Sequence, residues 1–280
     1  SMLDSELPSL LLTYNRQLKD STREAVVKCK IDNLEVHSYN SFGVKYVSND
    51  CCTDSGFLTD YEINDVPQYK KIYIDEIQDC TRMYYNLIVK LLATQINPQL
   101  CVLGDPKQTI FVFKGADHRY LTLANDVFKS NREWVRLNLE TSYRLTRPMA
   151  AVMNKSILGE EKFKAIKDGP PVHMYIMKPS HAYIVVEEIL KRPGVKPSDI
   201  FVLNYSTKNT SKNMIALENK LKDVPRVVLN DDSGIIDNKV IEGKLVISSF
   251  HRVKGLGRPI VIVIGFDTGY HFSDRNSSKD

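Results

Sequence analysis

Short runs of β-branched and apolar residues alternate with amphipathic stretches along most of the 280-residue chain, and this alternation constrains the fold more than any other feature. Strands separated by helices run parallel, because a crossover helix returns the chain to the same end of the sheet. We therefore expect an α/β fold with mainly parallel sheets flanked by helices. The predicted strands are 10–13, 34–38, 71–74, 100–103, 134–139, 172–176, 200–203, 226–229, 245–248 and 260–264, and the predicted helices are 16–28, 81–94, 116–128, 147–157, 180–191 and 206–221.

A composition break divides the chain into two parts. Within residues 158–171, the tetrapeptides Gly-Glu-Glu-Lys and Asp-Gly-Pro-Pro interrupt the alternation of strand and helix patterns. Stretches rich in Gly and Pro are typical of domain boundaries. We expect two α/β domains, residues 8–157 and residues 172–280. The Ser-Met start is typical of a cloned segment behind a protease site, so we expect the chain to be a cut from a longer protein.

Charge and cysteine content narrow the class of protein. Lys and Arg number 38 and Asp and Glu number 34, so the net charge is +4, which tolerates an anionic partner without requiring one. The five cysteines are odd in number and include no C-x-x-C pair, so neither a disulfide framework nor a standard zinc site is indicated. A reducing, intracellular compartment is expected. No apolar run approaches the roughly 18 residues of a membrane helix, so no membrane partner is expected.

The segment Lys71-Ile-Tyr-Ile-Asp-Glu-Ile-Gln-Asp79 is an apolar strand that ends in acids. Residues that follow a parallel strand face the ligand crevice at the carboxyl end of the sheet. In that position Asp75 could hold Mg²⁺ through its shell of waters, and Glu76 could orient and deprotonate an attacking water. The alternative is a solvated acidic turn that carries no chemistry.

A second strand, one predicted helix later, also ends in a polar turn. Gly104-Asp-Pro is followed by Gln108, whose uncharged amide could hydrogen-bond a γ-phosphate or the attacking water. Phe111 and Phe113 then alternate and lead into Lys114. The two aromatic residues are either part of a core or a stacking platform for the bases of a single strand.

These two segments together resemble motifs II and III of the superfamily 1 helicases of the UvrD/Rep/PcrA type. The family pattern is Asp-Glu-x-Gln-Asp, followed by Gly-Asp-x-x-Gln-x-Ile-Tyr/Phe-x-Phe-Arg-Gly-Ala. The resemblance implies two RecA-like domains, with ATP and Mg²⁺ bound between them and single-stranded DNA held across both. It assigns Asp75 to the metal, Glu76 to catalysis, and Gln108 to both catalysis and nucleotide binding.

Further motifs follow in the family's order. Residues 10–18 resemble motif Ia, residues 36–42 the next DNA-contacting motif, residues 137–144 motif IV and residues 246–256 motif V. By this resemblance Tyr143 stacks on the adenine, Arg144 reaches the γ-phosphate as a catalytic residue, and Lys254 and Gly255 face the nucleotide. The DNA-binding residues that it implies are Tyr14, Asn15, Arg16, His37, Tyr39, Phe111, Phe113, Lys114, His251 and Arg252. Without the resemblance, Arg144 would read as a surface cation, and His251 and Tyr14 as packed side chains.

The sequence departs from the family pattern in three places. It contains no Gly-x-x-x-x-Gly-Lys-Ser/Thr phosphate loop, it has Gly257 where the family has a nucleotide-binding glutamate, and it contains no motif VI. A phosphate loop supplies backbone amides and a lysine to the phosphates. We therefore expect this chain alone to hydrolyse ATP very poorly.

Two functions from different classes compete. The first is the core fragment of an ATP-dependent DNA helicase or single-strand translocase. It is supported by the presence of Asp75, Glu76, Gln108 and Arg144. The second is a non-catalytic module that binds single-stranded nucleic acid or a protein. It is supported by Gly257 and by the lack of a phosphate loop in this sequence. DNA is preferred over RNA because the helicases with the most similar motifs act on DNA.

Overall fold

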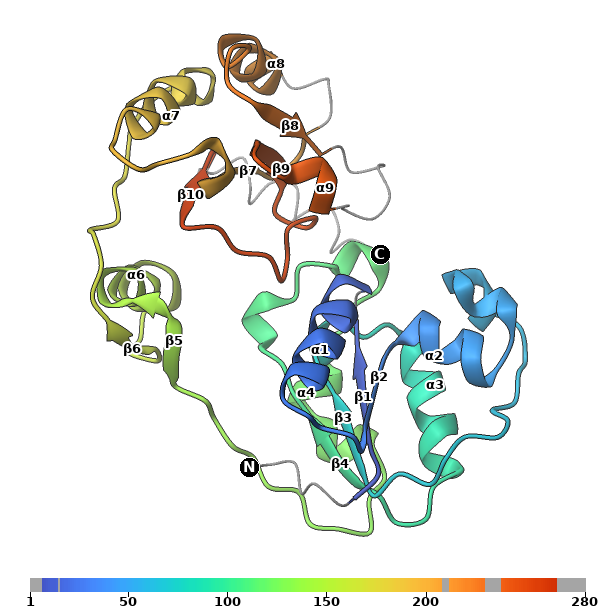
Figure 1. Ribbon diagram of the computed structural model, residues 1–280. Coiled ribbons are helices and arrows are strands. Elements are labelled where there is room, and N and C mark those ends of the chain that lie inside the picture. Colours follow the sequence, from blue (N-terminus) through green and yellow to red (C-terminus); the bar gives the residue numbers. More distant parts are fainter. Residues whose placement is uncertain (1–6, 15, 208–211, 230–237, 266–280) are drawn as a thin grey trace.

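Two four-stranded sheets, each with parallel strands, form the framework of the protein, and a small two-stranded sheet lies between them in the sequence (Figure 1). The computed structural model describes residues 7–14, 16–207, 212–229 and 238–265. All the strand pairs are parallel. The predicted α/β class with parallel sheets flanked by helices is confirmed.

The first sheet has the strand order β2-β1-β3-β4. Its strands are β1 (Ser9–Thr13), β2 (Leu34–Ser38), β3 (Lys71–Ile74) and β4 (Gln99–Val102). Helix α1 (Arg16–Lys28) lies on one side of the sheet, and α2 (Tyr39–Tyr46) and α3 (Arg82–Ala93) lie on the other (Figure 1). The chain then forms the short helices α4 (Arg119–Thr122) and α5 (Ala124–Val127).

The core of this first unit joins aliphatic strand residues to an aromatic layer. Leu12 and Ile74 are fully buried and adjacent in register, and Leu87 of α3 packs in the same cluster. Tyr39 and Tyr84 stack with their ring centroids 4.3 Å apart. Burying apolar surface on both faces of a parallel sheet stabilises this arrangement.

The second sheet, which together with its helices forms the second unit of the protein, has the order β10-β7-β9-β8. Its strands are β7 (Ile200–Asn204), β8 (Arg226–Val228), β9 (Leu245–Ser249) and β10 (Ile260–Val263). The associated helices are α7 (Ala182–Leu190), α8 (Lys212–Lys220) and α9 (Asn238–Ile241). Every residue of β7 and β9 is buried, which is typical of central strands in a parallel sheet.

A connecting segment carries the third sheet, in which β5 (Thr141–Thr146) pairs with β6 (Lys164–Lys167). Between these strands lie α6 (Arg147–Val152) and a π-helical turn, Met153–Leu158. The composition break at 158–171 therefore contains a strand, and the domain limits 8–157 and 172–280 stay a prediction.

Two predicted strands are wrong. Residues 134–139 and 172–176 form no strand, although their apolar residues alternate as in a strand. Val135, Leu137 and Leu139 are 73%, 73% and 85% exposed, and Ile176 is fully exposed. A strand needs a neighbour to satisfy its backbone groups, and neither segment has one among the described residues.

Several predicted helices are shorter than expected, and two, α2 and α9, were missed. Residues 116–128 form two short helices. Within the predicted helix 206–221 the described helix is Lys212–Lys220, and residues 208–211 lie outside the described residues. Helix α2 was missed because Gly, Ser and Tyr are weak helix formers. A capping box between Ser38 and Ser41 starts α2, a signal that could have revealed it. Among the described residues, no helix has the length and apolar character needed to cross a membrane.

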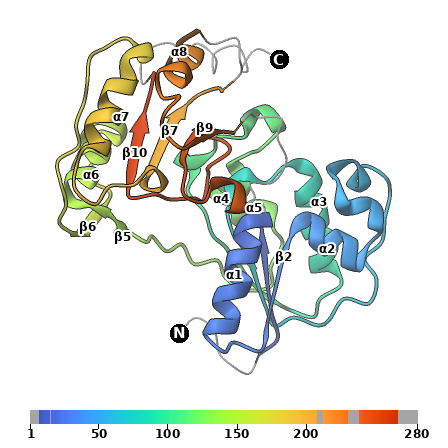
Figure 2. The ribbon, with the colours of Figure 1, turned by 45° about the horizontal axis from the view of Figure 1, so that its top comes forward.

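Short 3₁₀ turns shape the loops at the sheet edges. They are Asn49–Cys52, Asp54–Phe57, Ile77–Asp79, Pro106–Gln108, Val112–Lys114, Pro179–His181 and Pro197–Asp199. Three of them, Ile77–Asp79, Pro106–Gln108 and Val112–Lys114, follow β3 and β4. They bring the polar residues of both loops to the carboxyl end of the first sheet. Figure 2 shows the second sheet beside the first unit in a turned view.

Candidate functional site

The acids that follow β3 lie at the carboxyl end of the first sheet. The Asp75 N–H donates to the Leu12 carbonyl at 2.8 Å, which continues the sheet for one residue. Glu76 then takes a left-handed conformation with φ +55°. A non-glycine residue rarely adopts this conformation, and it is concentrated at functional sites. Burial, followed by the charge of Glu76, raises the pKa of Asp75 above its usual value.

Gln78 links the two polar loops, a role that the sequence did not reveal. Its side chain is fully buried, its Nε2 donates to Glu76 Oε2, and its Oε1 accepts from the Asp105 N–H at 3.2 Å. A Cβ on Gly104 would lie 2.2 Å from Gln78 Oε1, so the approach requires glycine. The Gln in the Asp-Glu-Ile-Gln segment and the Gly before Asp105 were the signals available.

Asp79 and Lys254 join the two units. Lys254 follows β9, and its Nζ donates to Asp79 Oδ2, and to the Gln108 carbonyl at 2.9 Å. The same Nζ lies 3.4 Å from Glu76 Oε2. Burial raises the pKa of Asp79 to about 6, and the hydrogen bond from Lys254 opposes that rise. The predicted site residue Lys254 therefore lies on the acidic edge of the other unit.

Other predicted nucleotide residues fall into two groups. The exposed Gln108 side chain donates to Asp105 Oδ2 at 3.1 Å, close to the acids. Gly255 has φ +86°, which lets the chain turn sharply after Lys254. Tyr143 and Arg144 lie on β5, both exposed. No hydrogen bond or ion pair found among the described residues joins them to Asp75, Glu76 or Gln108, and Figure 1 shows β5 away from the first sheet.

Several predicted DNA-binding residues form one aromatic surface, which we define as Tyr14, Phe111, Phe113, Lys114 and His251. Tyr14 stacks on Phe111 at 5.3 Å, and His251 meets Phe113 edge-on at 5.3 Å. The Lys114 ammonium lies over the Phe111 ring at 5.4 Å. Phe113 is 62% exposed, whereas Phe111 is buried. The two interpretations therefore apply to different residues. Phe111 packs inside the protein, as a core residue does, and Phe113 is open to a partner.

The remaining predicted DNA contacts lie elsewhere. Tyr39 is fully buried and His37 is 4% exposed, so their side chains offer little surface to a strand in this structure, and their contact with DNA stays a prediction. Arg16 is exposed on α1 with its Nε 3.8 Å from Asp20. Arg252 is half-buried beside His251. Asn15 lies outside the described residues.

The burial of His37 has a local cause in a carboxylate on β2. His37 Nε2 lies 2.7 Å from Glu35 Oε1, and Lys45 Nζ lies 2.5 Å from the same oxygen. Tyr46 and Tyr69 also donate to this carboxylate. Burial alone would raise the pKa of Glu35, but the hydrogen bonds outweigh it and hold that pKa below its usual range. His37 therefore stabilises the fold.

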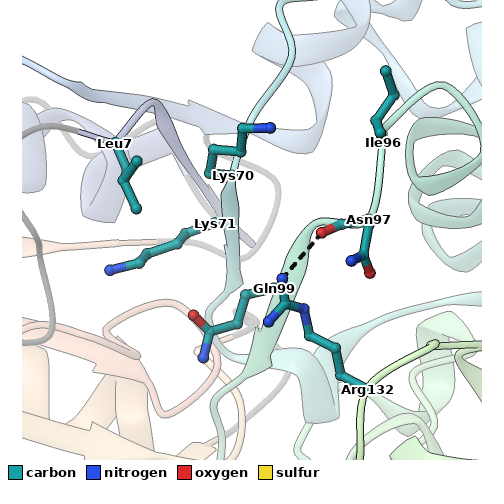
Figure 3. A pocket seen from close by; sticks show the side chains of 7 residues that line it. All are labelled: Leu7, Lys70, Lys71, Ile96, Asn97, Gln99 and Arg132. Atoms are coloured by element: carbon teal, nitrogen blue, oxygen red, sulfur yellow. Dashed lines mark hydrogen bonds between the residues drawn. The ribbon is translucent and has the colours of Figure 1, made fainter.

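A hollow at the opposite end of the first sheet is lined by Leu7, Lys70, Lys71, Ile96, Asn97, Gln99 and Arg132 (Figure 3). Arg132 donates to the Asn97 carbonyl at 3.5 Å. Figure 3 shows the side chains of Lys70 and Lys71 directed to different sides. The cationic groups of this hollow therefore do not converge on one point.

The carboxyl end of the first sheet attracts positive charge. Asp75, Glu76 and Asp79 lie within five residues, and the Lys254 ammonium lies between the last two. Asp79 Oδ1 is buried and has no hydrogen-bond partner among the described residues. No group of three or more His, Cys, Asp or Glu side chains in the described part of the chain is arranged to hold a metal. The chemistry fits a Mg²⁺ ion held by one or two carboxylates together with phosphates.

Comparison with known proteins finds a family model and several helicases that match part of the chain. Residues 15–129 match the UvrD/REP helicase N-terminal domain. The chain is 32% identical over 145 residues to the ATP-dependent DNA helicase srs2 of Schizosaccharomyces pombe, covering 49% of this chain and 16% of that protein. It is 32% identical over 156 residues to the ATP-dependent DNA helicase PcrA of Staphylococcus aureus, covering 52% of this chain and 20% of that protein. The PcrA of Staphylococcus epidermidis is 31% identical over 155 residues.

Residues 15–129 therefore match a UvrD/REP helicase N-terminal domain, and the chain shows distant homology to the PcrA and srs2 helicases. The resemblance inferred from the two acidic and polar motifs is confirmed at this level. The matches span a fifth or less of the length of these relatives.

Proposed function

We propose that this chain is the core part of an ATP-dependent DNA helicase or single-stranded DNA translocase of the UvrD type, acting inside the cell. The observation that carries the proposal is the carboxyl end of the first sheet, where Asp75 and Glu76 are bridged to the next loop by Gln78. The second unit reaches the same edge through Lys254. The family match over residues 15–129 and the similarity to two ATP-dependent DNA helicases agree with it.

In this proposal, residues 8–157 and 172–280 are two RecA-like domains that hold ATP between them. Asp75 would hold Mg²⁺, whose charge offsets that of the phosphates. Glu76 would orient the attacking water and accept its proton, while Gln108 contacts the γ-phosphate side. Gly255 would allow close approach of the nucleotide.

Tyr143 and Arg144 require a rearrangement to serve the nucleotide. Both are exposed on β5, and Arg144 is held locally by the bond from its N–H to Ser142 Oγ at 3.3 Å. Arg144 would reach the γ-phosphate only if β5 moved toward the first sheet. A guanidinium that arrives with such a closure stabilises the charge of the transition state, and closure would then gate hydrolysis.

Single-stranded DNA would lie on the aromatic surface. Phe113 offers an exposed ring, His251 and Arg252 come from the second unit, and Arg16 and Lys114 supply charge for phosphates. Stacking on an aromatic ring contributes about 1–3 kcal/mol per base and tolerates any sequence. With a net charge of only +4, we expect weak binding that falls as the salt concentration rises.

A second candidate is a non-catalytic module that binds single-stranded nucleic acid without turnover. Gly257 favours this second candidate, because glycine has no side chain to hydrogen-bond the nucleotide as the family's glutamate does. Both candidates predict oligonucleotide binding, and they differ in ATP turnover. For this chain alone we expect a turnover below about 1 per second, the low end for phosphoryl-transfer enzymes.

The test is fluorescence anisotropy with a labelled single-stranded oligonucleotide at several salt concentrations. Phe113→Ala should weaken binding about 5- to 100-fold through lost stacking, with little change in the salt dependence. Arg16→Ala should instead reduce the salt slope by about one. Tyr175→Ala is the matched control, because Tyr175 is 47% exposed and lies outside the aromatic surface.

Two outcomes would count against the proposal. If Phe113→Ala and Arg16→Ala both bind as the unchanged chain does, DNA does not follow the aromatic surface. A chain extended to include a phosphate loop that still shows no DNA-stimulated ATP turnover would favour the non-catalytic module. In such an extended chain, Glu76→Gln should abolish hydrolysis and spare nucleotide binding.

A further inference from the structure

The aromatic surface continues into the first unit as a chain of ring contacts. Tyr14 stacks on Phe111 and also meets the ring of Tyr84 edge-on, with the ring centroids 6.2 Å apart. Tyr84 belongs to α3, is 4% exposed, and stacks on the fully buried Tyr39. Phe57 meets the same ring at 5.9 Å. Tyr84 therefore links the buried rings of the first unit to the aromatic surface.

The segment between α2 and β3 holds the hydroxyl group of Tyr84. This segment forms the 3₁₀ turns Asn49–Cys52 and Asp54–Phe57, which lie beside α2 and α3 (Figure 1). The Tyr84 hydroxyl donates to Asp54 Oδ1 at 2.7 Å, and Asn40 Nδ2 lies 3.4 Å from the same oxygen. Burial, followed by this hydrogen bond, raises the pKa of Tyr84, so the phenol stays protonated and remains a donor.

Close packing fixes the turn that carries Asp54. A Cβ on Gly56 would lie 2.2 Å from the Asp50 carbonyl oxygen. A Cβ on Gly43 of α2 would lie 2.5 Å from the Phe57 ring. Both approaches require glycine. The backbone around Asp54 is therefore tightly packed against its neighbours, and its carboxylate is an acceptor at a defined position.

We propose that Asp54 and Tyr84 are positioning residues of the aromatic surface. The bond between them fixes the tilt of the Tyr84 ring, against which Tyr14 rests. Tyr14 in turn stacks on Phe111, whose ring centroid lies 6.2 Å from that of the exposed Phe113. A ring that is already held in place loses less conformational freedom when a base stacks on it, so binding is tighter. The positioning stands on these contacts alone, whereas its effect on a single strand rests on the proposed function.

The first measurement follows Phe111 without nucleic acid, by ¹⁹F NMR of protein labelled with 4-fluorophenylalanine. Phe111→Leu assigns the resonance. Asp54→Ala should shift or broaden it, whereas Asp54→Asn should leave it in place, because an amide oxygen can still accept from the Tyr84 hydroxyl. Both substitutions remove the same charge, so the contrast between them reports the hydrogen bond alone. The positioning is overturned if Asp54→Ala leaves the resonance unchanged, or if both variants shift it equally.

The second measurement is oligonucleotide anisotropy at several salt concentrations. Asp54→Ala should bind about 3- to 10-fold more weakly than Asp54→Asn, and Tyr84→Phe should bind more weakly than the unchanged chain by a similar factor. The salt slope should stay constant within each comparison, because the two proteins compared carry the same charge. Added to Phe113→Ala, the Tyr84→Phe substitution should have no further effect, because it acts through that ring.

Tyr85→Phe is the matched control. Tyr85 follows Tyr84 on α3, its hydroxyl donates to the Val127 carbonyl at 2.8 Å, and its ring stacks on Tyr120. The substitution removes a comparable hydrogen bond from the same helix, so oligonucleotide affinity should not change. Equal weakening in Tyr84→Phe and Tyr85→Phe would show a general loss of stability and overturn the positioning. If the ¹⁹F contrast appears while Phe113→Ala leaves the affinity unchanged, the positioning stands and the proposed path of the strand fails.

Discussion

The loops that follow β3 in the first sheet and β9 in the second carry opposite charges. After β3 the chain presents Asp75, Glu76 and Asp79, whereas after β9 it presents Arg252 and Lys254. In the first sheet the polar groups hold each other through Gln78, while in the second the loop reaches outward to the other unit. The two loops meet, because Lys254 of the second lies against Asp79 and Glu76 of the first.

The two cores differ as well. The first unit relies on stacked aromatic residues such as Tyr39 and Tyr84, whereas the second is almost entirely aliphatic, with Leu217 and Leu245 fully buried. Separate buried clusters predict separate folding units. The following predictions test that difference, beginning with the largest expected effect.

Truncating one core residue in each unit should separate the two stabilities. Leu87→Ala in α3 and Leu217→Ala in α8 each remove a fully buried side chain, at an expected cost of about 2–5 kcal/mol. Each variant should shift the unfolding of its own unit only. Hydrogen exchange by mass spectrometry, resolved by peptide, measures this. If each variant exposed the peptides of both units equally, the cores would be one cooperative system.

The buried Asp79 should make stability depend on pH. Its folded-state pKa of about 6 lies above the usual 3.8, so between about pH 4 and pH 6 only the native state keeps the proton. Stability should therefore fall as pH rises through this window, by up to about 3 kcal/mol. Asp79→Asn should remove the fall in urea-unfolding series.

An exposed acid provides the control for Asp79. Asp60→Asn removes a carboxylate that is fully exposed, so it should retain the fall between pH 4 and pH 6. Glu35 acts in the opposite direction, because its folded-state pKa is held low. Its contribution should be lost as pH falls below about 4.5. A flat profile between pH 4 and pH 6 in the unchanged protein would contradict the assignment.

Replacing a glycine by alanine should affect stability differently at Gly104, which follows β4, and at Gly257, which lies between β9 and β10. Gly104→Ala puts a Cβ 2.2 Å from Gln78 Oε1 and should cost about 1–3 kcal/mol, because the buried amide loses its bond to Asp105. Gly257→Ala meets nothing within 4 Å and should be close to neutral. Thermal unfolding of both variants measures the contrast. Equal melting temperatures would show that the Gln78 bridge yields easily.

The smallest effect concerns the start of helices. Ser38 accepts from the Ser41 N–H in the capping box of α2, so Ser38→Ala should cost about 1 kcal/mol. His181 precedes α7 and makes no side-chain cap, so His181→Ala should change stability little. Chemical unfolding resolves the two. A neutral Ser38→Ala would mean that packing of Tyr39 and Phe42 alone holds α2.

Local patterns predicted most of the central framework. Helix α1 and strands β2 and β3 have the predicted limits, β1, β7, β8, β9 and β10 differ by one residue at one end, and β4 is shifted by one residue at both ends. These segments could be predicted because the spacing of apolar residues along a buried strand or an amphipathic helix shows which of its residues are buried. The segments 134–139 and 172–176 have the same pattern and form no strand, since a strand also requires a neighbour that local sequence does not specify.

The sequence by itself determined the chemical groups of the site and their place at strand ends: Asp75 and Glu76 after β3, Gln108 after β4, and Lys254 after β9. Only the tertiary structure decided which of them meet. It turned His37 into the core against Glu35, left Arg144 exposed on β5, and put Lys254 against Asp79. The physical reason is the sequence distance between the contacting groups, because strand and helix patterns report contacts only within a few residues along the chain. The charge pairing at this junction joins groups 175 residues apart, which no local period records.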